Sequence, residues 1–149
     1  MERAIELAMA SIRSGGGPFG ALIVKDGRVI ATGTNRVVPE SDPTAHAEIV
    51  AIRAACAALG SFQLQDCEIF TTCEPCPMCL GAIYWARPAR VFYGAVAADA
   101  ARAGFDDAFI YEQIGTAHAA RSIPFISMMR DEALACLREW QAKPDRARY

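Results

Sequence analysis

Two short segments of this 149-residue chain carry side chains that could hold a metal ion and move a proton. The first is residues 46–48 (HAE), and the second is residues 75–79 (PCPMC). Cys76 and Cys79 are three apart at the expected start of a helix, so their side chains share one face of it. A helix N-terminus favours thiolates over thiols. Two thiolates and the imidazole of His46 would give a tetrahedral zinc ion three ligands and leave a fourth position for water, which is the catalytic arrangement.

Glu48 lies two residues after His46 and could reach a zinc-bound water without being a ligand itself. Zinc lowers the pKa of such a water to about 7. A carboxylate in this position suits a proton shuttle, which would take a proton from the water and return protons to a ring nitrogen of the substrate and to its leaving amine.

Other interpretations of the cysteines are open at this point. Cys73 forms a second, overlapping C-x-x-C pair with Cys76, a spacing that is also found in redox pairs, and a single C-x-x-C can be half of a zinc ribbon. The sequence contains no second pair that would close a structural zinc site. A non-catalytic zinc or redox module would also leave Glu48 without a task.

The composition excludes several classes of protein. With 53% hydrophobic and 21% charged residues, the chain is not intrinsically disordered, and its length fits one domain, residues 1–149. A formal net charge of −2 argues against a nucleic-acid backbone as the main partner. No apolar run approaches the ~20 residues of a membrane span. The first residues do not resemble a signal peptide, so we expect a cytoplasmic protein without a membrane partner.

The apolar periodicity and the turn residues predict an α/β domain. Helices are expected over residues 4–14, 44–59, from Pro75 or Pro77 to about residue 86, and over 131–141, and strands over 19–24, 28–33, 67–71, 90–94 and 123–128. Asp26-Gly27 indicates a hairpin, and Asp42 or Thr44 is the expected N-cap of the helix after it. Residues 34–43 form a polar loop, and residues 95–115 mix helix and loop. This order predicts a mostly parallel sheet with helices on both faces.

The joint pattern H-x-E, 26 residues, P-C-x-x-C is the signature of zinc-dependent nucleobase deaminases. The chain resembles the cytidine-deaminase-like superfamily, and within it the small bacterial guanine deaminases. The similarity lies in residues 18–27, 34–37, 42–56, 73–88 and 103–114. The resemblance implies a three-layer α/β/α fold with a mixed five-stranded sheet, one Zn²⁺ per chain, and hydrolytic deamination of guanine to xanthine and ammonia.

The resemblance also assigns roles to residues. His46, Cys76 and Cys79 would bind zinc, and Glu48 and Asp107 would be the catalytic acids. Asp106 could cap the following helix while Asp107 points inward, which the sequence leaves open. In this family the C-terminal segment, here about residues 130–149, is exchanged between subunits, so a homodimer is expected in which the last Tyr closes the neighbouring site. The substrate contacts would be Phe19, Asn35, Ala47, Trp85 and Tyr149.

Two related activities share the same motifs. A tRNA adenosine deaminase should have a basic surface and a basic last helix to hold an anticodon loop. Here the expected last helix contains Asp131, Glu132 and Glu139, so we expect a free purine base, and not a nucleic acid, as the substrate. The second alternative is a deaminase of another small amino-heterocycle, such as cytosine, a pterin or an aminotriazine.

Overall fold

The structure is a computed structural model that describes residues 1–148. The chain divides into two units, residues 1–110 and the residues from 111 onward. The first unit contains the sheet and the candidate site, and the second contains most of α6, a short 3-10 helix and α7. The expectation of a single domain with an exchanged C-terminal segment stays a prediction. No helix among the described residues is long and apolar enough to cross a membrane.

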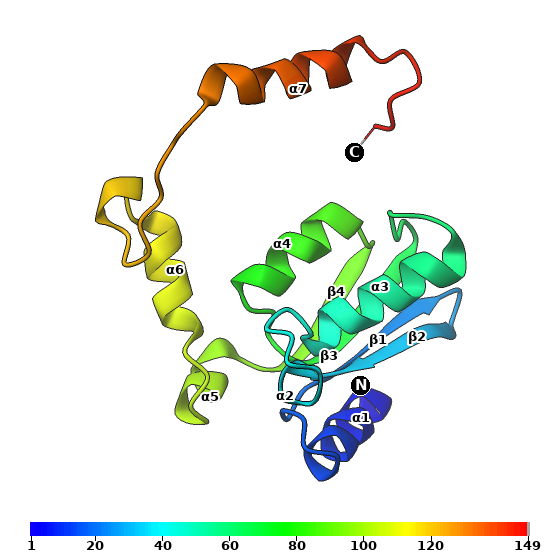
Figure 1. Cartoon of the computed structure of the whole chain (residues 1–149). Helices are drawn as coiled ribbons and strands as arrows, with labels where there is room; N and C mark the ends of the chain where they lie inside the picture. The colour runs from blue at the N-terminus through cyan, green and yellow to red at the C-terminus, as the bar shows by residue number, and fades with distance from the viewer. Residues whose placement is uncertain (149) are drawn as a thin grey trace. The chain divides into compact units, whose positions relative to one another are not determined.

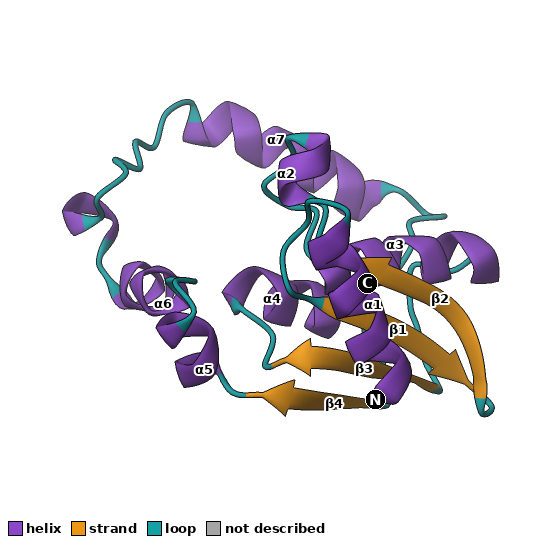
Figure 2. Ribbon diagram, turned by 90° about the horizontal axis from the view of Figure 1, so that it is seen from below, coloured by secondary structure: helices purple, strands orange, loops and turns teal. Residues whose placement is uncertain are grey.

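The sheet has four strands, which are β1 (Gly20–Lys25), β2 (Arg28–Thr34), β3 (Cys67–Cys73) and β4 (Arg90–Ala95) (Figure 1). Their order is β2-β1-β3-β4, with β1 antiparallel to both β2 and β3, and β3 parallel to β4 (Figure 2). The prediction of a mixed α/β sheet is confirmed, but the prediction that it is mostly parallel is wrong. β2 and β3, which α3 connects, do run in the same direction. They are not neighbours, however, because β1 lies between them and pairs with both.

The fifth strand predicted over residues 123–128 is also wrong. The described residues of this segment form no strand and pair with no sheet. Ile123, Phe125 and Ile126 are exposed in the chain. β-branched and aromatic residues fit a half-buried pleated surface, and they specify a strand only where a neighbouring strand is present.

Helices cover both faces of the sheet. On one face lies α1 (Glu2–Arg13), and on the other lie α3 (Ala47–Leu59) and α4 (Pro77–Ala86) (Figures 1 and 2). Two glycines allow the close approach of the helices. A Cβ atom at Gly20 would lie 2.3 Å from the carbonyl oxygen of Ala4 in α1, and one at Gly33 would lie 2.1 Å from that of Ala47 in α3. The three-layer α/β/α arrangement is therefore confirmed.

The helix α3 begins later than the sequence indicated. Its N-cap is His46, with extended backbone angles, and neither Asp42 nor Thr44. Asp42 is occupied elsewhere, because its Oδ1 accepts hydrogen bonds from the backbone N–H (2.8 Å) and the hydroxyl (2.7 Å) of Thr44. The carboxylate of Asp42 therefore binds within a local turn that precedes the helix, and it does not cap the helix. As a result His46, and not a small polar residue, stands at the first turn of α3.

The remaining elements agree with the predicted pattern except in one place. The loop over residues 34–43 contains a short helix, α2 (Val37–Glu40). Residues 95–115 form α5 (Ala97–Arg102) and α6 (Asp107–Gly115), and the last predicted helix is α7 (Arg130–Ala142). The hydrophobic core lies between the sheet and the layer of α3 and α4, and includes Ile23, Ala51, Leu64, Ile69 and Ile83.

Candidate active site

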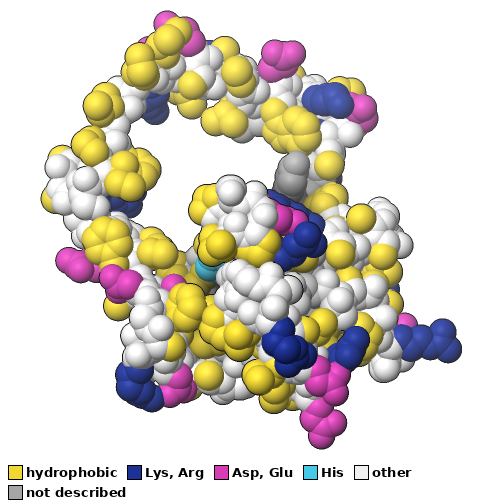
Figure 3. Space-filling view, turned by 60° about the horizontal axis from the view of Figure 1, so that its bottom comes forward, with side chains coloured by type: hydrophobic (Ala, Val, Ile, Leu, Met, Phe, Trp, Pro, Cys, Tyr) yellow, Lys and Arg dark blue, Asp and Glu magenta, His cyan; other side chains and the backbone are white. Residues whose placement is uncertain are grey.

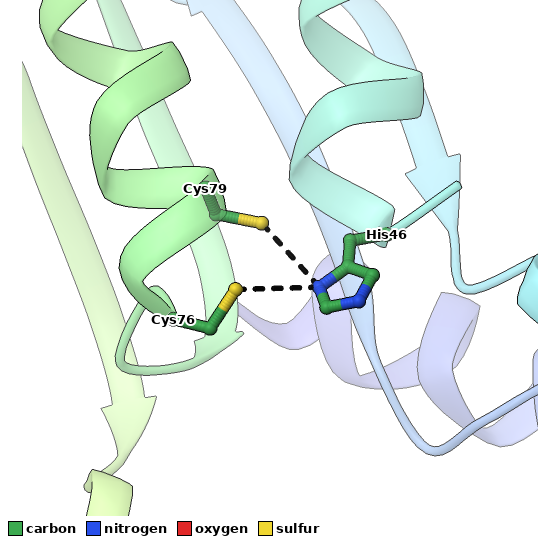
Figure 4. Close-up of side chains that lie close together, drawn as sticks. All are labelled: His46, Cys76 and Cys79. Atoms are coloured by element: carbon green, nitrogen blue, oxygen red, sulfur yellow. Dashed lines mark hydrogen bonds between the residues drawn. The ribbon is translucent and has the colours of Figure 1, made fainter. Parts of the chain in front are cut away.

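Two helix starts bring three metal-binding side chains together. His46 is the N-cap of α3, and Cys76 is the N-cap of α4, followed by Pro77 at the first helical position. Cys79 is in the first turn of α4 and is fully buried. Nδ1 of His46 lies 3.4 Å from Sγ of Cys76 and 3.6 Å from Sγ of Cys79 (Figure 4). The three ligand atoms all lie within 4.8 Å of one another.

This cluster fits one zinc ion. With Zn–S bonds of ~2.3 Å and Zn–N bonds of ~2.0–2.1 Å, the N–S edge of a tetrahedron is roughly 3.6 Å. The two observed N–S distances, 3.4 and 3.6 Å, match that edge. Two sulfurs and one imidazole nitrogen are also the donor types that zinc prefers. Among the described residues, no fourth His, Cys, Asp or Glu joins the group. Three protein ligands are the number found in catalytic zinc sites.

The electrostatics of the cluster favour an anionic ligand set. A hydrogen bond with Cys79 and a second with His46 lower the pKa of the Cys76 thiol to about 4. The hydrogen bond with Cys76, together with burial, raises the pKa of the Cys79 thiol. Hydrogen bonding to Cys76 raises the pKa of His46. A zinc ion held by both cysteines displaces any proton from their thiols, so the affinity of the cluster for zinc depends on pH.

Glu48 lies beside the cluster but is not part of it. Its side chain is 5% exposed, and burial raises the pKa of its carboxyl group. Oε1 accepts a 2.8 Å hydrogen bond from the hydroxyl of Thr71, and Oε2 accepts a weak one from the thiol of Cys79 at 3.5 Å. A carboxyl group placed beside the metal-binding cluster in this way can accept a proton and return it, as a proton shuttle must.

The metal-binding cluster opens into a cavity of about 390 Å³ in the first unit. The residues predicted from the sequence that line it are Phe19, Asn35, His46, Glu48, Cys76 and Asp107. The rings of Phe19 and Phe105 meet edge to face with their centroids 4.7 Å apart, and both line the cavity. The volume suits a ligand of the size of a purine base, and the two rings supply an apolar wall for it.

Asn35 is held in one orientation at the cavity wall. Its Oδ1 accepts hydrogen bonds from the backbone N–H of Gly17 (3.3 Å) and of Val37 (3.4 Å). A Cβ atom at position 17 would lie 3.0 Å from the Asn35 carboxamide, so the Gly-rich turn permits this contact. Because Oδ1 is occupied, the NH₂ group is the part of the side chain that can donate to a ligand.

The two neighbouring acids at the start of α6 have separate positions. Oδ1 of Asp106 accepts a 3.3 Å hydrogen bond from the N–H of Phe109, as an N-cap residue does. Asp107 lines the cavity, and burial together with the nearby Cys76 raises the pKa of its carboxyl group.

Two predicted substrate contacts, Ala47 and Trp85, are not at the cavity wall. Ala47 is buried in the first turn of α3, where it packs against Gly33, and Trp85 is exposed on α4. Neither is among the lining residues. Tyr149 lies outside the described residues. Their roles stay predictions.

The fold brings to the site several residues that were not predicted from the sequence. Phe105, Cys73 and Glu74 line the cavity, and Thr71 binds Glu48 from behind. The inward alternation of β3 could have indicated Thr71 and Cys73. Burial raises the pKa of the Cys73 thiol, which is the opposite of what a redox nucleophile needs.

Known proteins that are similar to this chain include zinc-binding deaminases, which fits the His46, Cys76 and Cys79 cluster. Residues 1–95 match the family described as the cytidine and deoxycytidylate deaminase zinc-binding region. A guanine deaminase of Bacillus subtilis is 53% identical over 150 aligned residues, which cover 100% of this chain and 96% of that protein. An X-ray structure of guanine deaminase from Bacillus subtilis has a TM-score of 0.96 at 54% identity, and covers 99% of this chain and 95% of its own.

The similarity to a tRNA-modifying enzyme is shorter. A tRNA-specific adenosine deaminase of Agrobacterium fabrum is 50% identical over 95 residues, which cover 61% of this chain and 62% of that protein. The resemblance to the first relative therefore includes the C-terminal third of the chain, whereas a large part of the chain has no counterpart in the second alignment.

Proposed function

Since the chain belongs to the family of the cytidine and deoxycytidylate deaminase zinc-binding region, we propose that it is a zinc-dependent guanine deaminase. The reaction is the hydrolysis of guanine to xanthine and ammonia. The observation that carries the proposal is that one cavity is lined by the ligands His46 and Cys76 and by the buried carboxyl group of Glu48. The full-length relative from Bacillus subtilis supports guanine as the substrate.

His46, Cys76 and Cys79 would hold the zinc ion. When bound, zinc lowers the pKa of a water molecule to about 7 and so supplies a nucleophile at neutral pH. Each ligand stands at a helix start. The helix α3 packs on β1 and β2, and α4 packs on α3, which restricts the freedom of the three donors.

Glu48 would carry the first proton. In the hydrolysis, the oxygen of water bonds to C2 of guanine and the bond from C2 to the amino nitrogen breaks. Glu48 takes a proton from the water and gives it to the ring nitrogen next to C2. Its burial and its raised pKa suit both halves of that transfer.

Asp107 would assist the departure of the amino group. Its carboxyl group lines the same cavity as Glu48, and its pKa is also raised by burial. The amino group accepts the second proton and leaves as ammonia, and a second acid on the cavity wall can contact it as it does so.

The purine base would lie against an aromatic wall and be oriented by an amide. Phe19 supplies the stacking surface predicted from the sequence, and Phe105 supports it edge to face. The NH₂ group of Asn35 would donate a hydrogen bond to an acceptor of the purine, since its Oδ1 is already bound by backbone N–H groups.

We further propose a homodimer in which about residues 130–149 are exchanged. Large apolar side chains are exposed in the second unit, and Figure 3 shows hydrophobic groups at the molecular surface. The exposed apolar side chains of the second unit include Phe125, Ile126 and Leu137. In the first unit, Trp85 and Tyr93, which is on the edge strand β4, are also exposed. Exposed apolar surface of this extent is typical of an interface. Absence of membrane and nucleic-acid partners and a cytoplasmic location stay predictions.

A tRNA adenosine deaminase is the second candidate, because the relative from Agrobacterium fabrum is 50% identical over its aligned part. One experiment separates the two. The zinc-loaded protein is incubated with guanine, adenine, cytosine, cytidine and an anticodon stem-loop, and ammonia release is measured. We expect the highest kcat/KM with guanine and the formation of xanthine. Preference for the stem-loop, or for another base, would refute guanine as the substrate.

A further inference from the structure

One hydrogen bond joins the candidate catalytic carboxyl group to a residue of β3 that does not itself line the cavity. The hydroxyl of Thr71 in β3 donates to Oε1 of Glu48 at 2.8 Å. The side chains of β3 alternate between buried and partly buried positions, and Thr71 is at a buried position with no exposed surface. It is not among the residues that line the cavity, so it can act on a substrate only through Glu48.

We propose that Thr71 is a positioning residue for the deamination, whose hydroxyl fixes the rotation of the Glu48 carboxyl group. This inference rests on the proposed function. Without a partner on Oε1, the carboxyl group could turn about its terminal torsion, which is broad for glutamate. With Oε1 held by Thr71, Oε2 is the oxygen on the side of the metal-binding cluster, where it contacts the thiol of Cys79.

The hydrogen bond from Thr71 to Oε1 can persist both when Glu48 takes up a proton and when it gives the proton away. When Oε2 carries the proton, Oε1 remains an acceptor, so the hydroxyl of Thr71 can donate to it before and after the proton moves. A hydroxyl is a neutral donor and adds no charge to the buried site. Thr71 therefore maintains one geometry through the cycle, and its loss should lower kcat without weakening substrate binding.

The test compares three variants of the zinc-loaded protein. Thr71→Val has nearly the same shape but no hydroxyl, and Thr71→Ser keeps the hydroxyl. Thr72→Val is the matched control on the opposite side of the strand, where the Thr72 hydroxyl accepts the N–H of Gly20 at 3.1 Å. We expect Thr71→Val to lower kcat about 10-fold or more, with KM within roughly twofold. Thr71→Ser should restore most of kcat, and Thr72→Val should leave it unchanged.

Zinc content and the Kd of the product xanthine should be the same in all variants, because neither depends on the bond to Thr71. A wild-type kcat in Thr71→Val, an equal loss in Thr71→Ser, or a loss that appears in KM would overturn the proposal. If Thr71→Val does not fold, Thr71→Ala replaces it with the same criteria. If the wild-type protein is inactive on guanine, the proposed function fails, and the series is measured on the panel substrate that is deaminated.

Discussion

Asp106 and Asp107 are adjacent in the chain, but only one of them faces the cavity. Asp106 caps α6 through the N–H of Phe109, whereas Asp107 lines the wall together with Glu48. The structure thus separates a structural acid from a candidate catalytic acid at neighbouring positions, a distinction that the sequence left open.

That separation can be tested with a matched pair of variants. Asp107→Asn removes the acid from the cavity, and we expect kcat to fall by about 10²-fold, the lower end of acid–base contributions. Asp106→Asn should keep nearly full activity, since Asn caps helices about as well as Asp. Steady-state kinetics on guanine checks both. If the two variants lose activity equally, Asp107 has no role of its own.

The pH dependence of stability gives a second test of Asp107. Burial raises its pKa in the folded chain above the ordinary value of 3.8, so the folded state binds more protons than the unfolded state just above that pH. Its contribution therefore destabilises the fold increasingly as the pH rises from about 4. We expect Asp107→Asn to be more stable than the wild type at pH 7 in urea unfolding, and the difference to shrink toward pH 4. A pH-independent difference would contradict this.

The metal assignment predicts a pattern of zinc contents. The wild-type protein should bind one zinc per chain, and His46→Ala and Cys79→Ser should lose it. Cys136→Ser removes an exposed thiol on α7 and should retain full zinc. Metal analysis by mass spectrometry measures all four proteins. Full zinc in the His46 and Cys79 variants would mean that these residues are not the ligands.

Glu48→Gln tests the proton shuttle. Gln keeps the size of the side chain and can still accept the hydrogen bond from Thr71, but it cannot take up a proton. We expect zinc to be retained and turnover to fall at least about 100-fold. The checks are zinc content and single-turnover kinetics. Near-normal turnover would transfer the shuttle role to another acid of the cavity wall, such as Asp107.

The exchanged tail is tested by complementation. Deleting residues 145–149 should lower turnover or raise KM while zinc stays bound, because a lid contributes closure and not metal binding. Mixing this protein with Glu48→Gln should recover part of the activity after subunit exchange, since each mixed dimer would contain one complete site. Exchange is followed by native mass spectrometry. Verified exchange without recovery of activity would show that the tail does not act across subunits.

The metal-binding residues and Glu48 could be predicted because each half of the site is a local motif, and the joint pattern H-x-E and P-C-x-x-C is the signature that links the two halves. His46 is the N-cap of α3 and Glu48 is in its first turn, so the two lie close together, and the C-x-x-C spacing places the two thiols on one face of α4. The contact of Thr71 with Glu48 could not be predicted in the same way. Thr71 lies 23 residues away, and its facing partner depends on how α3 packs on β3.

Two errors have related physical causes. The strand predicted over residues 123–128 was inferred from composition alone, and a strand exists only when a partner supplies the other half of its hydrogen bonds. The mostly parallel sheet was inferred from the helices between strands, which fix the direction of β3 relative to β2 but not which strand lies between them. Both properties belong to the assembled sheet.

The contact between Gly33 and Ala47 gives the metal-binding cluster a remote point of control. Any side chain at position 33 would meet the backbone of α3 at its first turn, one residue after His46, and would lift that turn from the sheet. The cysteines would not follow, because they belong to a different helix. In a saturation mutagenesis screen, Gly33 would therefore score like a ligand, although it contributes no atom to the site. In a mutational map of this protein, a loss of activity at Gly33 would therefore reflect the close packing of β2 against α3 and not a role of Gly33 in the reaction.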